Sequence, residues 1–193
     1  MSLRVIGGEY RGRVLTTVRG FGTRPLLAQV REAVFNILGQ DLTGQEVWDL
    51  FAGTGASGIE ALSRGARRVA FVEKSNQALQ VLRQNLDILG EDARRRSLVL
   101  KVDAWDPPSI VFEGEDGEVP PDFVFLDPPY PAVAEDPVRA AYRAQRLLQR
   151  TSPRGVVCFH FRDGQLDVDD FDPTLDVDLR VWGSTAFAFL RRR

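Results

Sequence analysis

The chain has 193 residues, 44% of them hydrophobic and 27% charged, with a formal net charge of −2 at pH 7. This length suits a single domain that buries about 70% of the surface of its unfolded chain. The composition argues against a membrane protein, because no apolar run approaches the roughly 18 residues that a bilayer requires, and against a protein that coats nucleic acid nonspecifically.

The single cysteine, Cys158, excludes an internal disulfide, and no cluster of cysteine and histidine is present to hold a metal. The N-terminus has no apolar segment typical of a secretory signal. We therefore expect a cytoplasmic protein without a structural metal.

The first 25 residues are basic, with five arginines against one glutamate, whereas residues 163–178 hold seven aspartates and no lysine or arginine. Residues 3–17 alternate and break at Gly7-Gly8, which predicts a short β-hairpin. We expect residues 1–25 to form a basic hairpin extension and residues 26–193 to form the main domain. Charge alone favours a solvated arm over an RNA-contacting arm.

A helix follows, with Pro25 suited to its first turn, an apolar stripe as far as Leu38, and Gly39 to end it. The chain then alternates between apolar strands and helices. Strands are expected at residues 46–51, 68–73, 97–103, 122–127 and 155–161, with helices between most of them. The last strands flank a turn at Gly183-Ser184. This order predicts an α/β fold with a doubly wound, mostly parallel sheet and an antiparallel C-terminal pair.

The helix expected near residues 136–150 begins with Asp136 as N-cap and Pro137 at its first position. Its arginines fall on one face, which is more often solvated than bound to nucleic acid. These arginines are Arg139, Arg143, Arg146 and Arg150.

A glycine-rich loop follows the first main-domain strand. Gly53, Gly55 and Gly58 have the spacing G-x-G-x-x-G, and Glu73 lies 20 residues beyond Gly53, which together fit the dinucleotide-binding fingerprint. Acidic residues near the ends of three successive strands favour a nucleoside ligand; they are Asp49, Glu73 and Asp103. Asp49 would repel a pyrophosphate but attract an ammonium group, which favours S-adenosyl-L-methionine over NAD.

Asp127, Pro128, Pro129 and Tyr130 end another apolar strand. If Asp127 and the Pro128 carbonyl accept both N–H bonds of a nucleobase amine, the nitrogen lone pair becomes available to a methyl group. Tyr130 is suited to stack on the base. This segment therefore indicates catalysis of methyl transfer to an exocyclic amine.

The segments DLFAGTGASGIEALSRGA and LDPPY resemble class I S-adenosylmethionine-dependent methyltransferases. Together with RVIGGEYRGRVL, TRP and VREAVFNIL, they resemble the bacterial enzymes that methylate guanine N2 in 16S ribosomal RNA. The resemblance implies a seven-stranded sheet with a reversed last hairpin and a base-binding segment from Asp127 to Tyr130. It implies that the cofactor is held by Asp49, Phe51, Gly53, Thr54, Gly55, Glu73, Lys74, Asp103 and Ala104. It also implies that RNA is contacted by Arg4, Arg11, Arg13 and Arg24.

One segment departs from the family, which usually continues the Arg-Pro pair with threonines and an acid. Here Leu26, Leu27 and Ala28 follow it, so the resemblance carries over no polar contact at these three residues. His160, the only histidine, lies in a strand and is expected to be a packed side chain.

The function expected is methyl transfer to guanine N2 of 16S rRNA, free or in a 30S assembly intermediate, by a monomer that does not bind membranes. The same chemistry would serve adenine N6 in DNA or RNA, and the residues of the segment do not decide between the two bases. An NAD-dependent oxidoreductase and a noncatalytic RNA-binding module are the alternatives from other classes.

Overall fold

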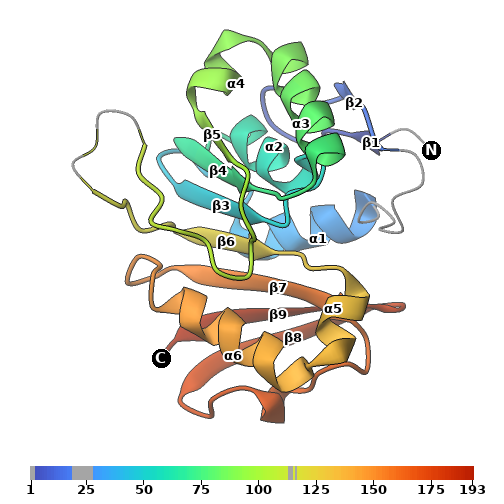
Figure 1. Ribbon diagram of the computed structural model, residues 1–193, viewed down its shortest axis with the longest axis vertical. Helices are drawn as coiled ribbons and strands as arrows, with labels where there is room; N and C mark the ends of the chain where they lie inside the picture. The colour runs from blue at the N-terminus through green and yellow to red at the C-terminus, as the bar shows by residue number, and fades with distance from the viewer. Residues whose placement is uncertain (1–2, 19–27, 113–114, 116) are drawn as a thin grey trace.

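The computed structural model describes residues 3–18, 28–112, 115 and 117–193. Its centre is a seven-stranded sheet with the strand order β5-β4-β3-β6-β7-β9-β8 (Figure 1). The strands are β3 (Glu46–Leu50), β4 (Arg68–Val72), β5 (Ser97–Leu100), β6 (Phe123–Leu126), β7 (Val156–Arg162), β8 (Leu175–Trp182) and β9 (Thr185–Arg192). Strands β3 to β7 are parallel, and β9 pairs antiparallel with both β7 and β8, which confirms the predicted topology.

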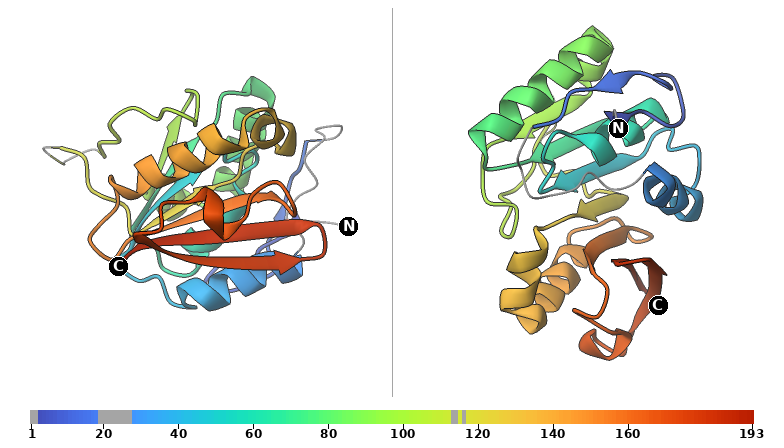
Figure 2. Two further views of the ribbon diagram at one scale, coloured as in Figure 1. Left: turned by 90° about the horizontal axis from the view of Figure 1, so that it is seen from below. Right: turned by 90° about the vertical axis from the view of Figure 1, so that its right-hand side faces the viewer.

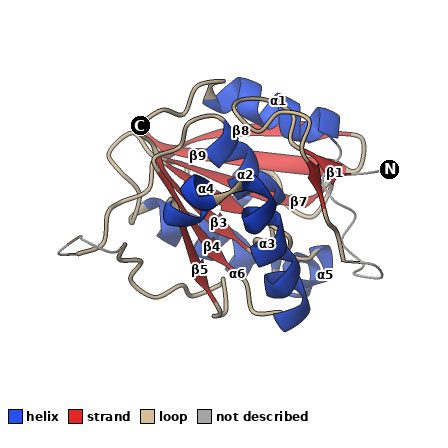
Figure 3. Cartoon of the chain, turned by 90° about the horizontal axis from the view of Figure 1, so that it is seen from above, coloured by secondary structure: helices blue, strands red, loops and turns tan. Residues whose placement is uncertain are grey.

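Helices cover both faces of this sheet (Figures 2 and 3). They are α1 (Ala28–Leu38), α2 (Ala56–Ser63), α3 (Asn76–Leu89), α4 (Glu91–Arg95), α5 (Tyr130–Glu135) and α6 (Pro137–Leu148), with a 3-10 turn η1 (Val168–Asp170). Side chains alternate along β3, so Val47 packs in one core with α1, α2 and α3, while Trp48 packs in the other with α5 and α6. Burial on both faces explains the continuous apolar runs of the central strands.

The N-terminal segment forms a short antiparallel hairpin of β1 (Leu3–Arg4) and β2 (Val14–Leu15), as predicted. Leu3, Val5 and Tyr10 are buried in the same core as α1, α2 and α3. The boundary expected between residues 25 and 26 lies outside the described residues, as do Pro25, Leu26 and Leu27. Within those described, no helix is long and apolar enough to cross a membrane.

Two elements near the functional residues differ from the sequence expectation. Strand β5 ends at Leu100, so Asp103 lies in the following loop instead of at the strand end. An extended turn was expected at Tyr130, but helix α5 begins there. The helix can start at this residue because Pro129 has the backbone conformation of an N-cap.

The predicted N-cap of α6 is confirmed, since the Asp136 carboxylate accepts a hydrogen bond from the Arg139 amide. The arginine face of α6 is only partly solvated. Arg139 and Arg146 are exposed, but Arg143 lies over the ring of Trp105. Arg150 donates to the carbonyls of two prolines and pairs with Glu118. The end of the helix is thereby fixed to the loop that precedes β6.

Candidate functional site

The parallel register brings the ends of the central strands to one edge of the sheet. Asp49 of β3 pairs with Phe71 of β4 on one side and with Phe125 of β6 on the other. Helices leave β3 and β6 on opposite faces, so this pair of strands is the point where the strand order reverses. Ligands of open α/β sheets bind in the crevice at that point, outside the carboxyl ends of the strands.

The glycine loop after β3 has an unusual backbone conformation. Phe51 has a φ of 60°, and Gly53 and Gly55 have φ values of 55° and 86°. A β-carbon at Gly55 would come within 2.3 Å of Leu82 Cδ1, so only glycine fits there. The strained Phe51 is the kind of backbone outlier that clusters at ligand-binding sites.

Asp49 is 2% exposed, and its Oδ2 accepts a hydrogen bond of 2.8 Å from the Gly58 amide. Burial raises the pKa of Asp49 well above its usual range; the Gly58 hydrogen bond opposes this effect, while the charges of Asp127 and Glu73 add to it. A β-carbon at Gly58 would lie 2.3 Å from Phe71 Cε1 and 2.9 Å from the same oxygen, which explains the third glycine of the motif. The geometry gives a buried anion that a cationic ligand would stabilise.

Glu73 follows β4 and supports the glycine loop. Its Oε2 accepts from the Gly53 amide at 2.9 Å, and its Oε1 accepts from the Ser75 amide at 2.8 Å. Each carboxylate oxygen has a second lone pair available, so Glu73 can also accept from ribose hydroxyls.

Asp103 lies beside an aromatic pair. Its Oδ1 accepts from the Trp105 amide at 2.9 Å, and its Oδ2 lies 3.4 Å from Lys74 Nζ. The hydrogen bond from Trp105, together with Lys74, lowers the pKa of Asp103 despite partial burial. Trp105 packs edge-on against Phe51 with ring centroids 5.0 Å apart. Ala104, which links Asp103 and Trp105 in the chain, is buried. The structure thus brings together the residues expected around an adenosine group.

Asp127 lies directly after β6, with 43% of its side chain exposed. Its Oδ1 contacts His160 Nδ1, and the hydroxyl of Tyr130 lies 3.0 Å from His160 Nε2. Pro128 is buried and Pro129 is exposed. Asp127 also lines a cavity of about 10 Å³ that Arg31 and Phe187 share, which links the segment to α1 and β9.

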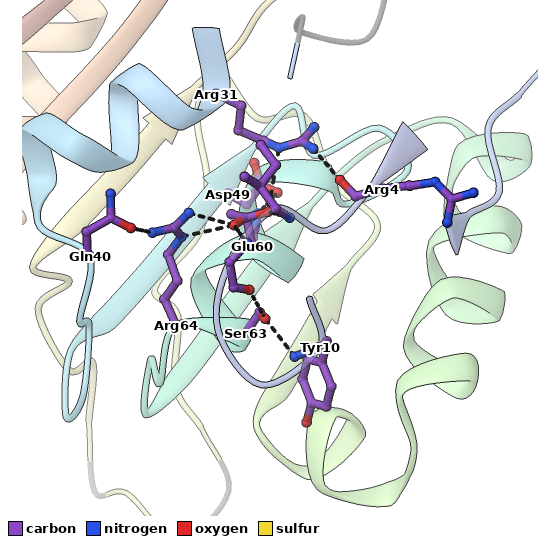
Figure 4. A network of polar contacts seen from close by, with 11 residues as sticks. Arg4, Tyr10, Arg31, Gln40, Asp49, Glu60, Ser63 and Arg64 are labelled. Carbon is purple, nitrogen blue, oxygen red and sulfur yellow. Dashed lines mark hydrogen bonds and ion pairs between the residues drawn. The ribbon is translucent and has the colours of Figure 1, made fainter. Parts of the chain in front are cut away.

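The hairpin is attached to the main sheet through the buried carboxylate of Glu60 on α2 (Figure 4). Glu60 accepts from the amides of Ile6 and Gly7 at 2.8 Å each and pairs with Arg64 at 2.9 Å. Arg31 of α1 lies 3.7 Å from Glu60 and donates to the Arg4 carbonyl. These four groups define what we call the Glu60 cluster: Glu60, Arg31, Arg64 and the hairpin backbone of residues 4–7.

The basic side chains of the hairpin are not part of this cluster. Arg4, Arg11 and Arg13 are exposed, and Arg4 also donates to the Gly12 carbonyl at 3.1 Å. Arg24 lies outside the described residues. The described arginines are therefore free of the buried charge network and face solvent.

Sequence analysis missed Asn85 as a site residue. This fully buried side chain of α3 donates to the Thr54 carbonyl at 2.9 Å and accepts from the Thr16 amide at 2.8 Å. It thereby joins the glycine loop to the N-terminal segment. A detectable signal was present, because Asn85 lies on the apolar face of α3 between Leu82 and Leu86. Glu60 and His160 show the same signal, since each is a polar residue inside an apolar element.

The parallel sheet, its reversed final hairpin and the glycine-rich crevice define the fold as that of a Rossmann-like methyltransferase. Among solved structures, "Putative methyltransferase yhhF from Escherichia coli" superposes with a TM-score of 0.75 at 26% identity, covering 100% of this chain and 99% of that one. The "putative methylase HI0767 from Haemophilus influenzae" superposes with a TM-score of 0.70 at 26% identity, covering 100% of this chain and 99% of that one.

Residues 3–190 match the family described as "Conserved hypothetical protein 95", and the chain belongs to this family. It is 39% identical over 128 residues to "Putative rRNA methyltransferase YlbH" of Bacillus subtilis, covering 66% of this chain and 67% of that protein. It is 37% identical to "Ribosomal RNA small subunit methyltransferase D" of Escherichia coli, covering 66% of this chain and 60% of that protein. These relatives confirm the predicted resemblance to a bacterial small-subunit ribosomal RNA methyltransferase family.

Proposed function

We propose that the protein transfers a methyl group from S-adenosyl-L-methionine to the exocyclic N2 amine of a guanine in 16S ribosomal RNA. The observation that carries this proposal is the position of Asp127 to Tyr130, at the end of the strand that pairs with β3 next to the glycine loop. The names of the two curated relatives, which specify ribosomal RNA, support the choice of substrate.

The residues of the crevice fit the cofactor. The buried carboxylate of Asp49 suits the ammonium and sulfonium charges. At Gly53 a β-carbon would meet only the Phe51 carbonyl oxygen, 4.0 Å away, so the backbone there is open to a ligand. Glu73 and Asp103 offer acceptors for ribose hydroxyls and for the adenine amino group. When bound, the cofactor supplies an electrophilic methyl group.

The protein's part in the reaction is to position the amine. Asp127 and the Pro128 carbonyl accept the two N–H bonds of the flipped guanine, which draws the nitrogen lone pair toward the methyl donor. Asp127 need not be a strong base, because the amine proton becomes acidic once the nitrogen is methylated and positively charged. The Tyr130 ring stacks on the base and stabilises the flipped position by roughly 1–3 kcal/mol.

The direct test incubates the protein with methyl-labelled cofactor and unmethylated 16S rRNA, either free or in 30S particles, with DNA as control. Digestion and identification of the labelled nucleoside are expected to give N2-methylguanosine. Label in N6-methyladenosine, or label in DNA, would contradict the guanine assignment and favour the adenine-N6 alternative. Stabilisation of the fold by NADH instead of S-adenosyl-L-methionine would contradict the methyltransferase assignment altogether.

A further inference from the structure

The histidine at position 160 occupies an unusual place in the sheet. Leu126 of β6 pairs with Phe159 of β7, so the next residues of the two strands, Asp127 and His160, are neighbours at the sheet edge. His160 is only 6% exposed, and its ring stacks on Phe187 of β9 with centroids 4.6 Å apart and an angle of 10°. Packing of this kind agrees with the sequence expectation and is what a phenylalanine would also provide.

Hydrogen bonding distinguishes His160 from a merely packed ring. Nδ1 contacts Asp127 Oδ1, and Nε2 lies 3.0 Å from the Tyr130 hydroxyl. That hydroxyl in turn lies 3.2 Å from Thr185 Oγ1. Both nitrogens of the buried imidazole therefore contact residues of the proposed catalytic segment.

The direction of these hydrogen bonds follows from the chemistry of the groups. An ionised carboxylate can only accept, so His160 Nδ1 donates to Asp127. In the neutral imidazole Nε2 is then an acceptor for the Tyr130 hydroxyl, whose oxygen accepts from Thr185. The result is a continuous chain of hydrogen bonds that starts on β9: Thr185 donates to Tyr130, Tyr130 donates to His160, and His160 donates to Asp127.

We propose that His160 is a positioning residue for methyl transfer, which holds the Asp127 carboxylate and the Tyr130 ring at a fixed separation across the target base. This inference rests on the proposed function. Asp127 lies beyond the end of β6 and is 43% exposed, so its own strand does not fix its carboxylate. The buried His160 supplies that restraint, and displacement of a reacting group by about 1 Å can slow a reaction about 100-fold.

The first experiment tests the geometry without requiring activity. His160 is the only histidine in the chain, so ¹⁵N-histidine labelling gives one pair of imidazole nitrogen signals. We expect Asp127→Asn to shift mainly the Nδ1 signal and Tyr130→Phe to shift mainly the Nε2 signal. If neither substitution moves its predicted nitrogen, the hydrogen-bonded chain does not exist in solution and the proposal is wrong.

The second experiment measures transfer by variants of His160. His160→Phe keeps the ring on Phe187 but removes both hydrogen bonds, and His160→Asn restores a donor near the Nδ1 position. We expect kcat to fall by up to about 100-fold in His160→Phe and to recover partly in His160→Asn, with the KM for the cofactor unchanged in both. Phe161→Leu is the matched control, since it disturbs the same strand on its opposite face.

The outcomes separate the two proposals. A wild-type rate retained by His160→Phe, or an equal loss in Phe161→Leu, would overturn the positioning role while leaving the proposed function intact. If the wild type transfers no methyl group although the nitrogen shifts appear as expected, the proposed function fails, and the hydrogen-bonded chain then has no role in transfer.

Discussion

Burial of Asp49 destabilises the protein when no cofactor is bound. Its carboxylate is 2% exposed, and its raised pKa means that the ionised form is less favourable in the folded than in the unfolded chain. The stability of the empty protein should therefore decrease as the pH rises from the ordinary carboxyl pKa, about 4, through the raised value. Bound cationic groups would offset this cost, so we expect cofactor binding and ionisation of Asp49 to be coupled.

Replacing Asp49 by asparagine tests this coupling. The amide oxygen still accepts from the Gly58 amide, so we expect the melting temperature of the empty protein at pH 7 to rise by about 2–4 °C for each kcal/mol of relieved burial cost. The affinity for S-adenosyl-L-methionine, measured by calorimetry, should fall. Adenosine, which lacks both cationic groups, is the control ligand and should bind both proteins equally.

The same coupling predicts a pH dependence of binding. In the wild type the affinity for the cofactor should decrease as the pH falls through the raised pKa of Asp49, at a higher pH than for an ordinary carboxyl group. Asp49→Asn should remove this component of the pH dependence. An identical pH profile in both proteins would show that Asp49 does not ionise on binding.

Asp127, unlike the buried Asp49, is half-exposed, and its proposed role is in the chemical step. Asp127→Ala should reduce methyl transfer by at least about 100-fold, because an acceptor for the target amine is lost. Cofactor affinity should stay within a small factor of the wild type, as Asp127 is placed on the base side of the crevice. Asp163→Ala, at an exposed turn after β7, is the control. Equal loss of transfer and cofactor binding would make Asp127 a structural residue.

At the level of elements, the Glu60 cluster determines how the hairpin is attached to α1 and α2. Arg31 and Glu60 are each 1% exposed and Arg64 is 5% exposed, so three charges share one buried space. Burial lowers the pKa of Arg31, and the charge of Glu60 opposes this effect. The carboxylate therefore compensates both guanidinium groups as well as two backbone amides.

Removal of that carboxylate should be costly. We expect Glu60→Ala to lower the free energy of unfolding by about 3–5 kcal/mol, because Arg31 and Arg64 are left buried without their counter-charge. Urea unfolding measures this change, and hydrogen exchange at the Ile6 and Gly7 amides should speed up. Glu32→Ala, on the exposed side of α1, should change stability by less than about 0.5 kcal/mol. Slow exchange at Ile6 and Gly7 in Glu60→Ala would show that the hairpin is held by apolar packing alone.

The strands of the main sheet were predictable because the apolar runs and turn residues that indicate them are local features of the sequence. Apolar runs of four to eight residues marked the strands, and the turn at Gly183-Ser184 separated the last two. Helix α4 and helix α5 were missed because short helices carry too few residues for a periodic pattern. The end of β5 was placed three residues too late, since the apolar pattern continues beyond the last residue that pairs with β4.

Across the whole molecule, charge is distributed unevenly. The basic hairpin packs near α2 and α3, while the acidic segment of residues 163–178 lies at the opposite end, around β8 (Figure 1). An anionic partner is therefore attracted to the hairpin end, whereas near β8 the aspartates lie beside Arg180 and Arg191. The basic hairpin end agrees with the expectation, drawn from the family resemblance, that RNA contacts the hairpin arginines.

Exchange of Arg11 and Arg13 for alanine should weaken binding to 16S rRNA and flatten its salt dependence. Each lost phosphate contact reduces the slope of log K against log salt by about 0.7–0.9, so the double variant should lose about 1.4–1.8 in slope. Arg154 and Arg180, both exposed and outside the hairpin, form the matched double control. A slope equal to that of the wild type would mean that the hairpin does not contact the RNA backbone.

The sequence by itself determined the succession of the strands and the longer helices, the glycine loop and the Asp-Pro-Pro-Tyr segment, because these depend on neighbouring residues. Only the tertiary structure decided which polar side chains meet. His160 lies 33 positions from Asp127, and Glu60 lies 54 positions from Ile6, yet each pair is in contact. Such contacts depend on strand register and helix packing, which the whole chain sets through its buried surfaces, so no local pattern specifies them.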